Sequence, residues 1–586
     1  MVNNTYIGIT LGPIYKTLGL VTKSRELWAA SYLFSYICKK LIEAFNSNGC
    51  KAENYIMPYW DKKEKSKPGA GFLPDRIIIH SSLGFDYDNV INIVQKVRKD
   101  VSEEIIFSLK NSKYKYLHNH KGYKRIGISE ILKDEKKAIE FLNSYFQIYS
   151  CEIDLDKIKI NGFNRLKTIN TVLDQLELRY SIVDTDPNPL RIFLHAVNHT
   201  FLLTDCFHPL ITHFDSLPEI ALRELRVKYR KAYDAASELV YDSIKSAPED
   251  LTKNVENEVF EEDEKEPFKD LISIALKDDS FRTYHNYVAI VTADGDNFGK
   301  LLKAIEGDTK DNSQFQNKLE AFSKQINNFS LETYKLIAGS RYTEDSKEDW
   351  GYGAAPVYLG GDDLLFFAPV MNKVGDCAIS IFDIVKQIDS IFQTYFEKDE
   401  YKNLKDEDGN EIKPCMSYGV YISYIKHPLR EAVLRSRELL EVIKEKKYET
   451  RNRLNFEVRK HSGSTFGAII DKNKTDLFNN FLSIINNQEF LDKEQFLSSI
   501  TQKMRDQKST VNSITEEDWH LKAYFDDEFN KGIHKKQRAY LDECREYLFK
   551  VGQLKNISEN PENELLLENF FSVLKLNHFL HSRIDD

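Results

Sequence analysis

Two apolar runs separated by a Gly-Gly-Asp-Asp tetrad constrain this chain more than any other stretch. The runs Val357–Leu359 and Leu364–Phe367 flank the tetrad at 360–363. Short apolar segments on either side of a Gly- and Asp-rich cluster predict two β-strands joined by a tight turn. Adjacent carboxylates at the tip of such a turn repel each other, and a divalent metal ion is a common counter-charge. A solvated Gly-Asp turn is the alternative, and this stretch alone does not decide between them.

The length and charge of the chain set its broad class. At roughly 100–200 residues per domain, 586 residues correspond to about three to five domains. A net charge of −10 argues against non-specific nucleic-acid binding over the whole surface, but it leaves room for a local basic groove. The seven cysteines form no CxxC pair, so we expect reduced thiols rather than a disulfide framework or a zinc site. Without a long apolar run or a signal peptide, we expect a cytoplasmic protein that does not enter a membrane.

The first 110 residues predict an α+β domain. Strands are expected at 6–11, 55–60 and 76–80, and amphipathic helices at 24–45 and 86–109. This β-α-β-β-α order places helices over one sheet.

A helical region is expected to follow, over about 110–280. Its clearest helix begins at Ser216 as N-cap, with Pro218 just inside, and runs through Leu239. The acidic stretch 255–269 is interpreted as a surface loop.

The strand signal returns at residue 287 and predicts a second α+β region. Its expected elements are a buried strand at 287–293, a helix at 315–337, the hairpin, a helix at 376–396, a strand at 416–424, a helix at 427–447 and a last strand at 455–458. Residues 6–10 align with 287–291, which indicates a weak internal repeat whose first copy lacks the carboxylates. After about residue 475 the chain is again predicted to be helical.

Two carboxylate clusters are the candidate catalytic centre. Asp294 and Asp296 end the first strand of the second region, and Asp362 and Asp363 lie at the hairpin tip. If the hairpin lies beside that strand, three or four carboxylates converge, as two divalent ions roughly 3.5–4 Å apart require. Oxygen ligands favour Mg²⁺ or Mn²⁺ over zinc. We expect the ligands to be Asp294, the carbonyl of Gly295, Asp362 and Asp363.

Several neighbours are candidate nucleotide-binding residues. Phe298 is more typical of core than of a stacking platform, each lysine or arginine is individually more typical of a solvated surface, and Asp296 could equally cap the following helix. Gly360 and Gly361 are expected to leave room for a nucleotide against the hairpin. The candidates are Gly295, Asp296, Asn297, Phe298, Gly360, Gly361, Lys446 and Arg459, with Lys300, Lys447 and Lys460 as further triphosphate partners.

The joint pattern resembles the palm domain of nucleotide cyclases and polymerases. It departs from diguanylate cyclases, whose tetrad continues Glu-Phe where this chain has Asp363-Leu364. The fuller resemblance is to the large palm-domain subunit of type III CRISPR effector complexes, in the Cmr branch. The residues that carry it are Leu11-Gly12-Pro13, the stretch from Thr22 to Tyr32, Leu73-Pro74-Asp75-Arg76, the stretch from Asp294 to Gly299, the tetrad at 360–363 and Ser417-Tyr418-Gly419-Val420.

The resemblance implies an α+β architecture of two ferredoxin-like palm domains and two helical domains. These are a degenerate palm at 1–165, a helical domain at 166–283, a catalytic palm at 284–472 and a C-terminal helical domain at 473–586. It implies synthesis of a nucleotide second messenger from ATP, switched on when target RNA pairs with the guide RNA of a complex containing other Cmr subunits. The usual product is a cyclic oligoadenylate.

Two departures from the family pattern bear on activity. No His-Asp dipeptide occurs, so the family's DNA-cutting HD domain is expected to be absent. The family's second domain often holds a cysteine zinc site, which the scattered cysteines here do not supply. Some members lacking the nuclease domain are thought to join AMP to S-adenosylmethionine, so the acceptor stays open. The alternatives are an RNA-independent cyclase-like enzyme and a non-catalytic scaffold. The intact Asp294, Asp362 and Asp363 argue against the scaffold.

Overall fold

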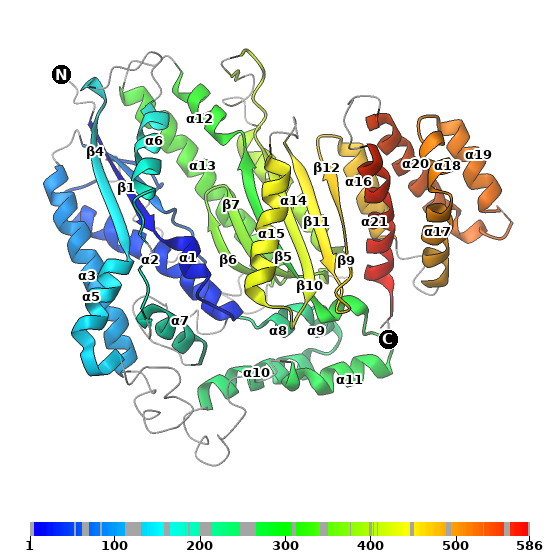
Figure 1. Ribbon diagram of the computed structural model, residues 1–586, viewed down its shortest axis with the longest axis horizontal. Helices are drawn as coiled ribbons and strands as arrows, with labels where there is room; N and C mark the ends of the chain where they lie inside the picture. Colours follow the sequence, from blue (N-terminus) through cyan, green and yellow to red (C-terminus); the bar gives the residue numbers. More distant parts are fainter. Residues whose placement is uncertain are drawn as a thin grey trace.

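Two antiparallel-rich sheets with helices on their faces form the body of the computed structural model (Figure 1). The structure describes residues 5–51, 54–60, 70–81, 85–111, 131–157, 165–181, 183–185, 188–199, 214–246, 265–307, 312–339, 350–374, 377–397, 401, 404–406, 408–445, 451–487, 494–530, 532–555 and 563–583. None of the described helices is long and apolar enough to cross a membrane.

The first sheet has the strand order β2-β3-β1-β4. Its strands are β1 (Thr5–Gly12), β2 (Tyr55–Met57), β3 (Arg76–His80) and β4 (Gln147–Asp154), and its helices are α1 (Ile14–Leu18), α2 (Ser24–Ser47), α3 (Tyr87–Asn111), α5 (Glu135–Tyr145) and α6 (Arg165–Glu177). Ile7 and Ile9 of β1 enter a core with α2 and α3, whereas Tyr6 packs on the α6 side. The two predicted helices of this region are confirmed.

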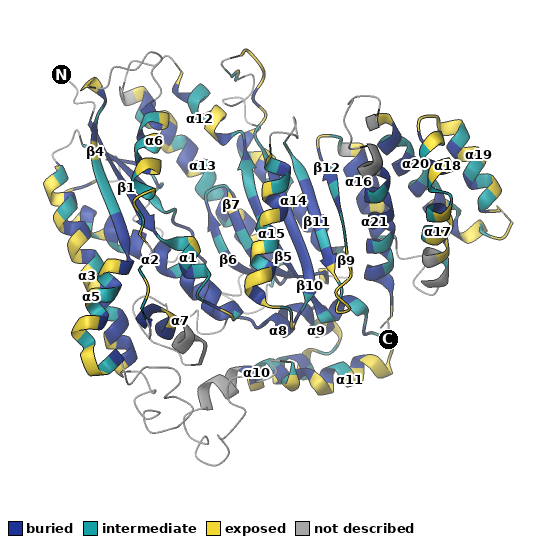
Figure 2. Ribbon diagram, in the orientation of Figure 1, coloured by how far each residue is buried: buried dark blue, intermediate teal, exposed yellow. Residues whose placement is uncertain are grey.

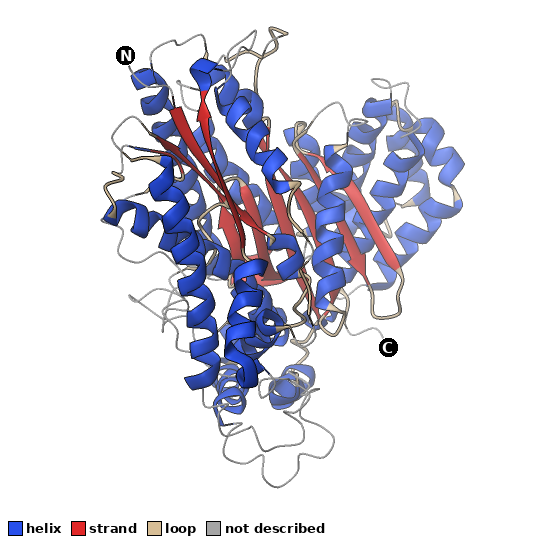
Figure 3. Ribbon diagram, turned by 60° about the vertical axis from the view of Figure 1, so that its left-hand side comes forward, coloured by secondary structure: helices blue, strands red, loops and turns tan. Residues whose placement is uncertain are grey.

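The second sheet has the order β12-β11-β10-β5-β7-β6, and Figure 3 shows the strands in red with helices packed on them. Its strands are β5 (Tyr287–Asp296), β6 (Ala355–Gly360), β7 (Asp363–Pro369), β10 (Cys415–Tyr424), β11 (Arg453–Arg459) and β12 (Thr465–Asp471). In both sheets the second, third, first and fourth strands of the region are neighbours in that order. This is the arrangement of a ferredoxin-like β-α-β-β-α-β unit, and it confirms the α+β fold and the predicted repeat.

Opposite faces of the second sheet carry different helices. The helices are α12 (Phe298–Glu306), α13 (Asn312–Ala338), α14 (Ile381–Phe396) and α15 (Leu429–Lys444). Ala289 and Val291 of β5 face α13 and α14, whereas Val288 and Ile290 enter the core that holds α15 and α2. Apart from the edge strands β4 and β12, the strands of both sheets are buried over most of their length (Figure 2).

Four strands were not predicted from the sequence. No strand was expected at β4, and the strand at 455–458, predicted to be the last, is followed by β12. The start of the helix predicted at 376–396 belongs instead to a hairpin of β8 (Met371–Val374) and β9 (Cys377–Ser380), after which α14 begins. β4 and β12 are edge strands of their sheets. Their alternate positions face solvent or one neighbouring layer, so their apolar pattern is weaker than that of a central strand.

Helices complete the middle and the end of the chain. They are α7 (Pro189–His199), α8 (Leu217–Ala221), α9 (Leu225–Lys228), α10 (Arg230–Ser246), α11 (Lys269–Lys277), α16 (Thr475–Ile485), α17 (Glu494–Asp506), α18 (Lys508–Ile514), α19 (Asp518–Glu528), α20 (Arg538–Lys555) and α21 (Asn563–His581). The helix predicted from Ser216 through Leu239 is divided into α8, α9 and α10. Ser216 is the N-cap of α8, as predicted, and it forms a capping box with Glu219. The acidic stretch lies largely outside the described residues.

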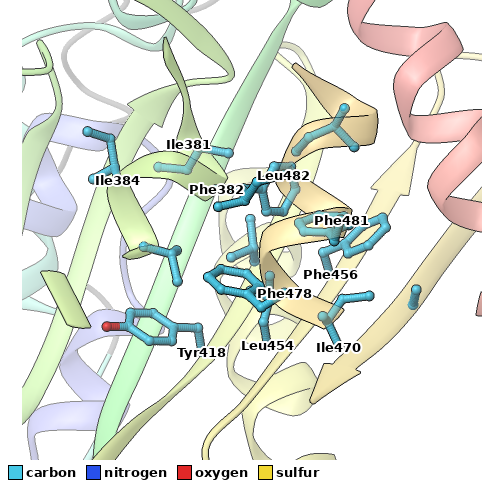
Figure 4. Close-up of a cluster of buried hydrophobic side chains, with 14 of the residues drawn as sticks. Ile381, Phe382, Ile384, Tyr418, Leu454, Phe456, Ile470, Phe478, Phe481 and Leu482 are labelled. Atoms are coloured by element: carbon cyan, nitrogen blue, oxygen red, sulfur yellow. The ribbon is translucent and has the colours of Figure 1, made fainter. Parts of the chain in front are cut away.

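The C-terminal helices are joined to the second sheet by an apolar cluster. Figure 4 shows Phe478, Phe481 and Leu482 of α16 against Phe382 of α14 and Phe456 of β11. The predicted boundary near residue 472 therefore crosses a continuous core, and the division into four domains stays a prediction.

The edge strand β6 is covered by the first region. The amide of Gly71 donates to the Val357 carbonyl at 3.3 Å, and the amide of Leu359 donates to the Gly71 carbonyl at 2.9 Å. The hydroxyl of Ser31 in α2 also donates to the Val357 carbonyl, at 3.3 Å. Because the backbone of β6 is paired on this side, the two regions meet directly beside the hairpin.

Candidate active site

The Gly-Gly-Asp-Asp hairpin lies beside the end of β5. The pairing of β5 with β7 runs to Ala293 opposite Leu364, so Asp294 and Asp363 are the next residues along the two strands. A β-carbon built on Gly295 would lie 2.7 Å from the β-carbon of Asp362. The predicted juxtaposition of hairpin and strand end is therefore confirmed.

Gly295 is enclosed by the hairpin on one side and by Phe298 on the other. The Phe298 ring occupies the space that a Gly295 side chain would need. Phe298 is 8% exposed, and its ring packs against those of Phe396, Phe392 and Phe322, with centroids 5.2, 5.6 and 5.7 Å away. Phe298 is thus a core residue beneath the site, as its type favoured, and it supports the strand end rather than stacking on a base.

The Asp296 side chain accepts hydrogen bonds within the sheet and does not cap α12. Its Oδ2 accepts from the Ser417 hydroxyl and from the amide of Asn452 at 3.0 Å. The N-cap of α12 is Asn297, in a left-handed backbone conformation and without a side-chain cap. Asn297 donates its side-chain amide to the Lys413 carbonyl at 3.0 Å. The cap alternative for Asp296 is wrong.

Lys444, in the last turn of α15, is a cation that the sequence did not single out. Its ammonium forms an ion pair with Asp294 and lies 3.7 Å from Oδ1 of Asp296. Burial and the Arg451 guanidinium lower the pKa of Lys444 to about 7, whereas the contact with Asp294 favours the charged form. The only sequence signal was the row of lysines at the end of the predicted helix.

The carboxyl groups of the site are electrostatically costly. Burial raises the pKa of Asp296, which is 3% exposed. Desolvation by the atoms around the hairpin raises the pKa of Asp362, and the negative charge of Asp296 raises it further. Asp363 reaches solvent at the tip, yet desolvation and then the Asp362 and Asp75 charges raise its pKa as well. The site therefore favours a bound cation or a proton.

The two glycines of the tetrad have different roles. Gly361 has a φ of +80°, which the turn requires and glycine adopts readily. At Gly360 the space of a side chain is filled by the ring of Tyr358. The expectation that Gly360 leaves room for a nucleotide is therefore wrong, because Tyr358 already occupies that space.

Of the predicted triphosphate partners, those that the structure describes do not gather at the carboxylates. Lys446 and Lys447 lie outside the described residues. Arg459 pairs with Ser423, eight positions along β10 from the Cys415 that pairs with Asp296, a separation of about 26 Å at ~3.3 Å per residue. Lys460 follows Arg459 at the same far end.

Lys300 is also engaged away from the carboxylates. It forms an ion pair with Asp406 at 3.0 Å.

The first region contributes one wall of the site. Asp75, just before β3, and Tyr15 of α1 are both close enough to Asp363 to influence charge there. The guanidinium of Arg437 in α15 stacks on the Tyr15 ring at 3.9 Å. Neither Tyr15 nor Asp75 was a predicted site residue, although Asp75 lies in one of the stretches that carry the family resemblance.

The side chains are of the chemical type that binds a divalent ion, but they do not form a complete coordination shell. Within the described ranges no three His, Cys, Asp or Glu side chains are arranged to hold a metal ion, so the predicted convergence of three or four carboxylates is not reached in this arrangement. Asp294 and Asp296 already hold a cation, the ammonium of Lys444. Oxygen donors of this kind suit Mg²⁺ or Mn²⁺.

Two family models match the chain over the two regions described above. Residues 287–455 match Cas10/Cmr2, second palm domain, and residues 6–108 match CRISPR-associated protein Cmr2, N-terminal. These two regions of the chain are Cas10/Cmr2 domains. The strand end of β5, the hairpin, α15 and Lys444 all lie inside the match to the second palm domain.

Solved structures share the fold at low identity. A type III-B Cmr-beta chain in the apo state is 12% identical, with a TM-score of 0.51 over 85% of this chain and 75% of that one. A Cmr-beta chain bound to cognate target RNA is 13% identical, with a TM-score of 0.47, covering 86% and 77%. A chain of a Csm1-Csm4 cassette in complex with cA4 is 12% identical, with a TM-score of 0.44, covering 94% and 69%. A comparison with curated proteins found no match.

Proposed function

We propose that this protein is a metal-dependent nucleotidyltransferase that makes a nucleotide second messenger from ATP. The observation that carries the proposal is the position of Asp294 beside the Asp362–Asp363 hairpin, within the part matched by the second palm domain of Cas10/Cmr2. Carboxylates that repel one another at the end of a central strand are costly to maintain unless a cation binds there. The site is therefore better suited to charged substrates and ions than to a structural role.

The reaction is an in-line displacement at the α-phosphorus of ATP. An acceptor oxygen forms the new bond to phosphorus, the bond to the bridging oxygen of the β-phosphate breaks, and pyrophosphate leaves. Asp294, the carbonyl of Gly295, Asp362 and Asp363 would hold two Mg²⁺ or Mn²⁺ ions, which activate the acceptor hydroxyl and neutralise the leaving oxygen when bound. Asn452 and Ser417 hold Asp296 in place beside these ligands.

The acceptor defines the product. A ribose hydroxyl of a second ATP leads to cyclic oligoadenylate, and S-adenosylmethionine leads to its conjugate with AMP. The donor half of the site is the same in both cases, because only the attacking group differs. The acceptor is expected on the side of Tyr15 and Asp75, since this wall faces Asp363 from the first region.

The proposed setting is a type III-B effector complex with other Cmr subunits, guide RNA and target RNA. The likeness in fold to a Cmr-beta chain and the two Cas10/Cmr2 domains support this setting. Activation by target RNA belongs to the same proposal.

The test is synthesis by the purified complex from labelled ATP and Mg²⁺, with and without matching target RNA. Product only with target supports the proposal. Product without RNA supports an RNA-independent cyclase-like enzyme, and no product under either condition supports a scaffold. Repeating the assay with S-adenosylmethionine identifies the acceptor. Asp362→Ala combined with Asp363→Ala is expected to abolish product and leave assembly intact, and an active double variant overturns the assignment.

A further inference from the structure

The ammonium of Lys444 lies where a positive charge is most favourable in the site. It contacts Asp294 and is 3.7 Å from Oδ1 of Asp296. The other carboxylate oxygen of Asp296 is engaged by Ser417 and by the amide of Asn452. The oxygen that remains for a metal ion is therefore the one that faces Lys444.

The packing of α15 on the sheet delivers Lys444 to this position. A β-carbon on Gly419 would lie 2.7 Å from the Leu440 amide nitrogen, so only glycine permits so close an approach of helix and strand. The Ser436 and Thr292 hydroxyls are hydrogen-bonded at 2.8 Å. Lys444 follows Leu440 by one helical turn, and Asp294 follows Thr292 on the same face of β5. The contact between Lys444 and Asp294 is thus set by a rigid interface.

We propose that Lys444 is a resident counter-ion that a divalent ion must displace from Asp294 and Asp296. The inference rests on the proposed function, because the ion is the one that the reaction needs. An ammonium and a divalent cation cannot share these two carboxylates without strong repulsion. A nucleotide polyphosphate brings the negative charge that offsets the exchange. The site therefore binds metal weakly by itself and tightly together with ATP.

The charges around Lys444 are consistent with this exchange. Arg451 faces it from the residues just before β11 and adds positive charge. Behind Asp296, the buried Lys472 is committed to Asp389, at 2.6 and 2.8 Å from its two oxygens, and does not reach the metal ligands. Among the described lysines, Lys444 is the one that contacts both Asp294 and Asp296.

The test is a titration of the nucleotide-free chain with Mn²⁺, with free Mn²⁺ measured by electron paramagnetic resonance. Lys444→Met is expected to lower the Kd for Mn²⁺ by at least about tenfold, because the ion then binds without having to break the ion pair between the ammonium and the carboxylates. Lys444→Arg keeps the charge and is expected to stay near wild type. Lys300→Met is the matched control, since Lys300 also pairs with an aspartate, Asp406, away from the site. Adding Asp294→Asn to Lys444→Met is expected to reverse the gain.

Unchanged or weaker Mn²⁺ binding in Lys444→Met overturns the proposal. If the wild-type complex still makes product in that case, the proposed function stands and only the role of Lys444 fails. If no variant binds Mn²⁺ and no product forms, both fail. A second measurement covers loss of folding in the variant, namely amine labelling of the wild-type chain read by mass spectrometry. Mn²⁺ is expected to increase labelling of Lys444 and not of Lys300, and no increase counts against displacement.

Discussion

Replacing Gly295 by alanine tests whether the strand end and the hairpin form one site. The new methyl group would lie on the Phe298 ring and 2.7 Å from the β-carbon of Asp362. Ordinary contacts between carbons are about 3.5–4 Å, so one partner has to move by about 1 Å. The Phe298 ring is held by three other phenylalanine rings. We therefore expect the hairpin to move.

The expected cost appears in both stability and activity. Overfilling a packed site destabilises a protein by about 1–3 kcal/mol. A shift of about 1 Å in a catalytic group can lower the rate on the order of 100-fold. Gly295→Ala is therefore expected to lower the rate of target-activated product formation by about that factor, with a modest decrease in melting temperature.

Gly299→Ala is the matched control. A β-carbon at Gly299, in the same motif but inside α12, meets nothing within 4 Å. Alanine is favoured over glycine in a helix by about 1 kcal/mol, so this variant is expected to keep its activity and to be slightly more stable. The assays are product formation by the complex and differential scanning fluorimetry. Gly295→Ala with wild-type activity would refute the juxtaposition described above.

Three further expectations concern stability. Arg223→Met removes the buried ion pair with Asp215, whose side chain is 2% exposed, and is expected to destabilise the chain by about 3–5 kcal/mol in urea unfolding. Lys39→Met removes an exposed pair and should cost less than about 1 kcal/mol. Burial lowers the pKa of His581, so its contribution to the stability of the fold is complete above about pH 6.5 and is lost as the pH falls. His581→Gln should therefore flatten the fall in melting temperature between about pH 7.5 and 5.5. An equally steep fall in the variant would contradict this. The pKa values of Asp362 and Asp363 are raised, so the pair stabilises the metal-free fold only at low pH and this is lost as the pH rises. Changing both to asparagine should raise the melting temperature most at pH 8 without Mg²⁺, and a pH-independent difference would argue against the shift.

Local patterns were sufficient for the hairpin, the long helices and the internal repeat. The glycines and aspartates of the tetrad specify a turn wherever they occur, because the backbone preferences involved span only a few residues. The uninterrupted apolar run of β5 indicates a central strand for a similar reason, since both of its faces are buried. The pairing of the carboxylate clusters followed from these two elements once they were assumed to be neighbours.

Strand direction explains why Arg459 was misplaced. β5 and β10 are antiparallel, whereas β10 and β11 are parallel. The last residue of β11 therefore lies near one end of β10, whereas Asp296, the last residue of β5, lies near the other end. The residue that approaches Asp296 is Asn452, just before β11 begins. No local pattern distinguishes a parallel from an antiparallel neighbour, because direction depends on how α15 crosses between the strands.

The sequence by itself determined that carboxylates and glycines meet at a turn beside a buried strand, since these features depend on neighbours in the chain. Tertiary structure alone decided which other groups face them. Lys444 lies 150 residues from Asp294 along the chain, and Tyr15 and Asp75 come from the first region. Their approach depends on helix packing over Gly419 and on the cover of β6 by the first region. Such contacts are properties of the packed interfaces and are not encoded in any short stretch.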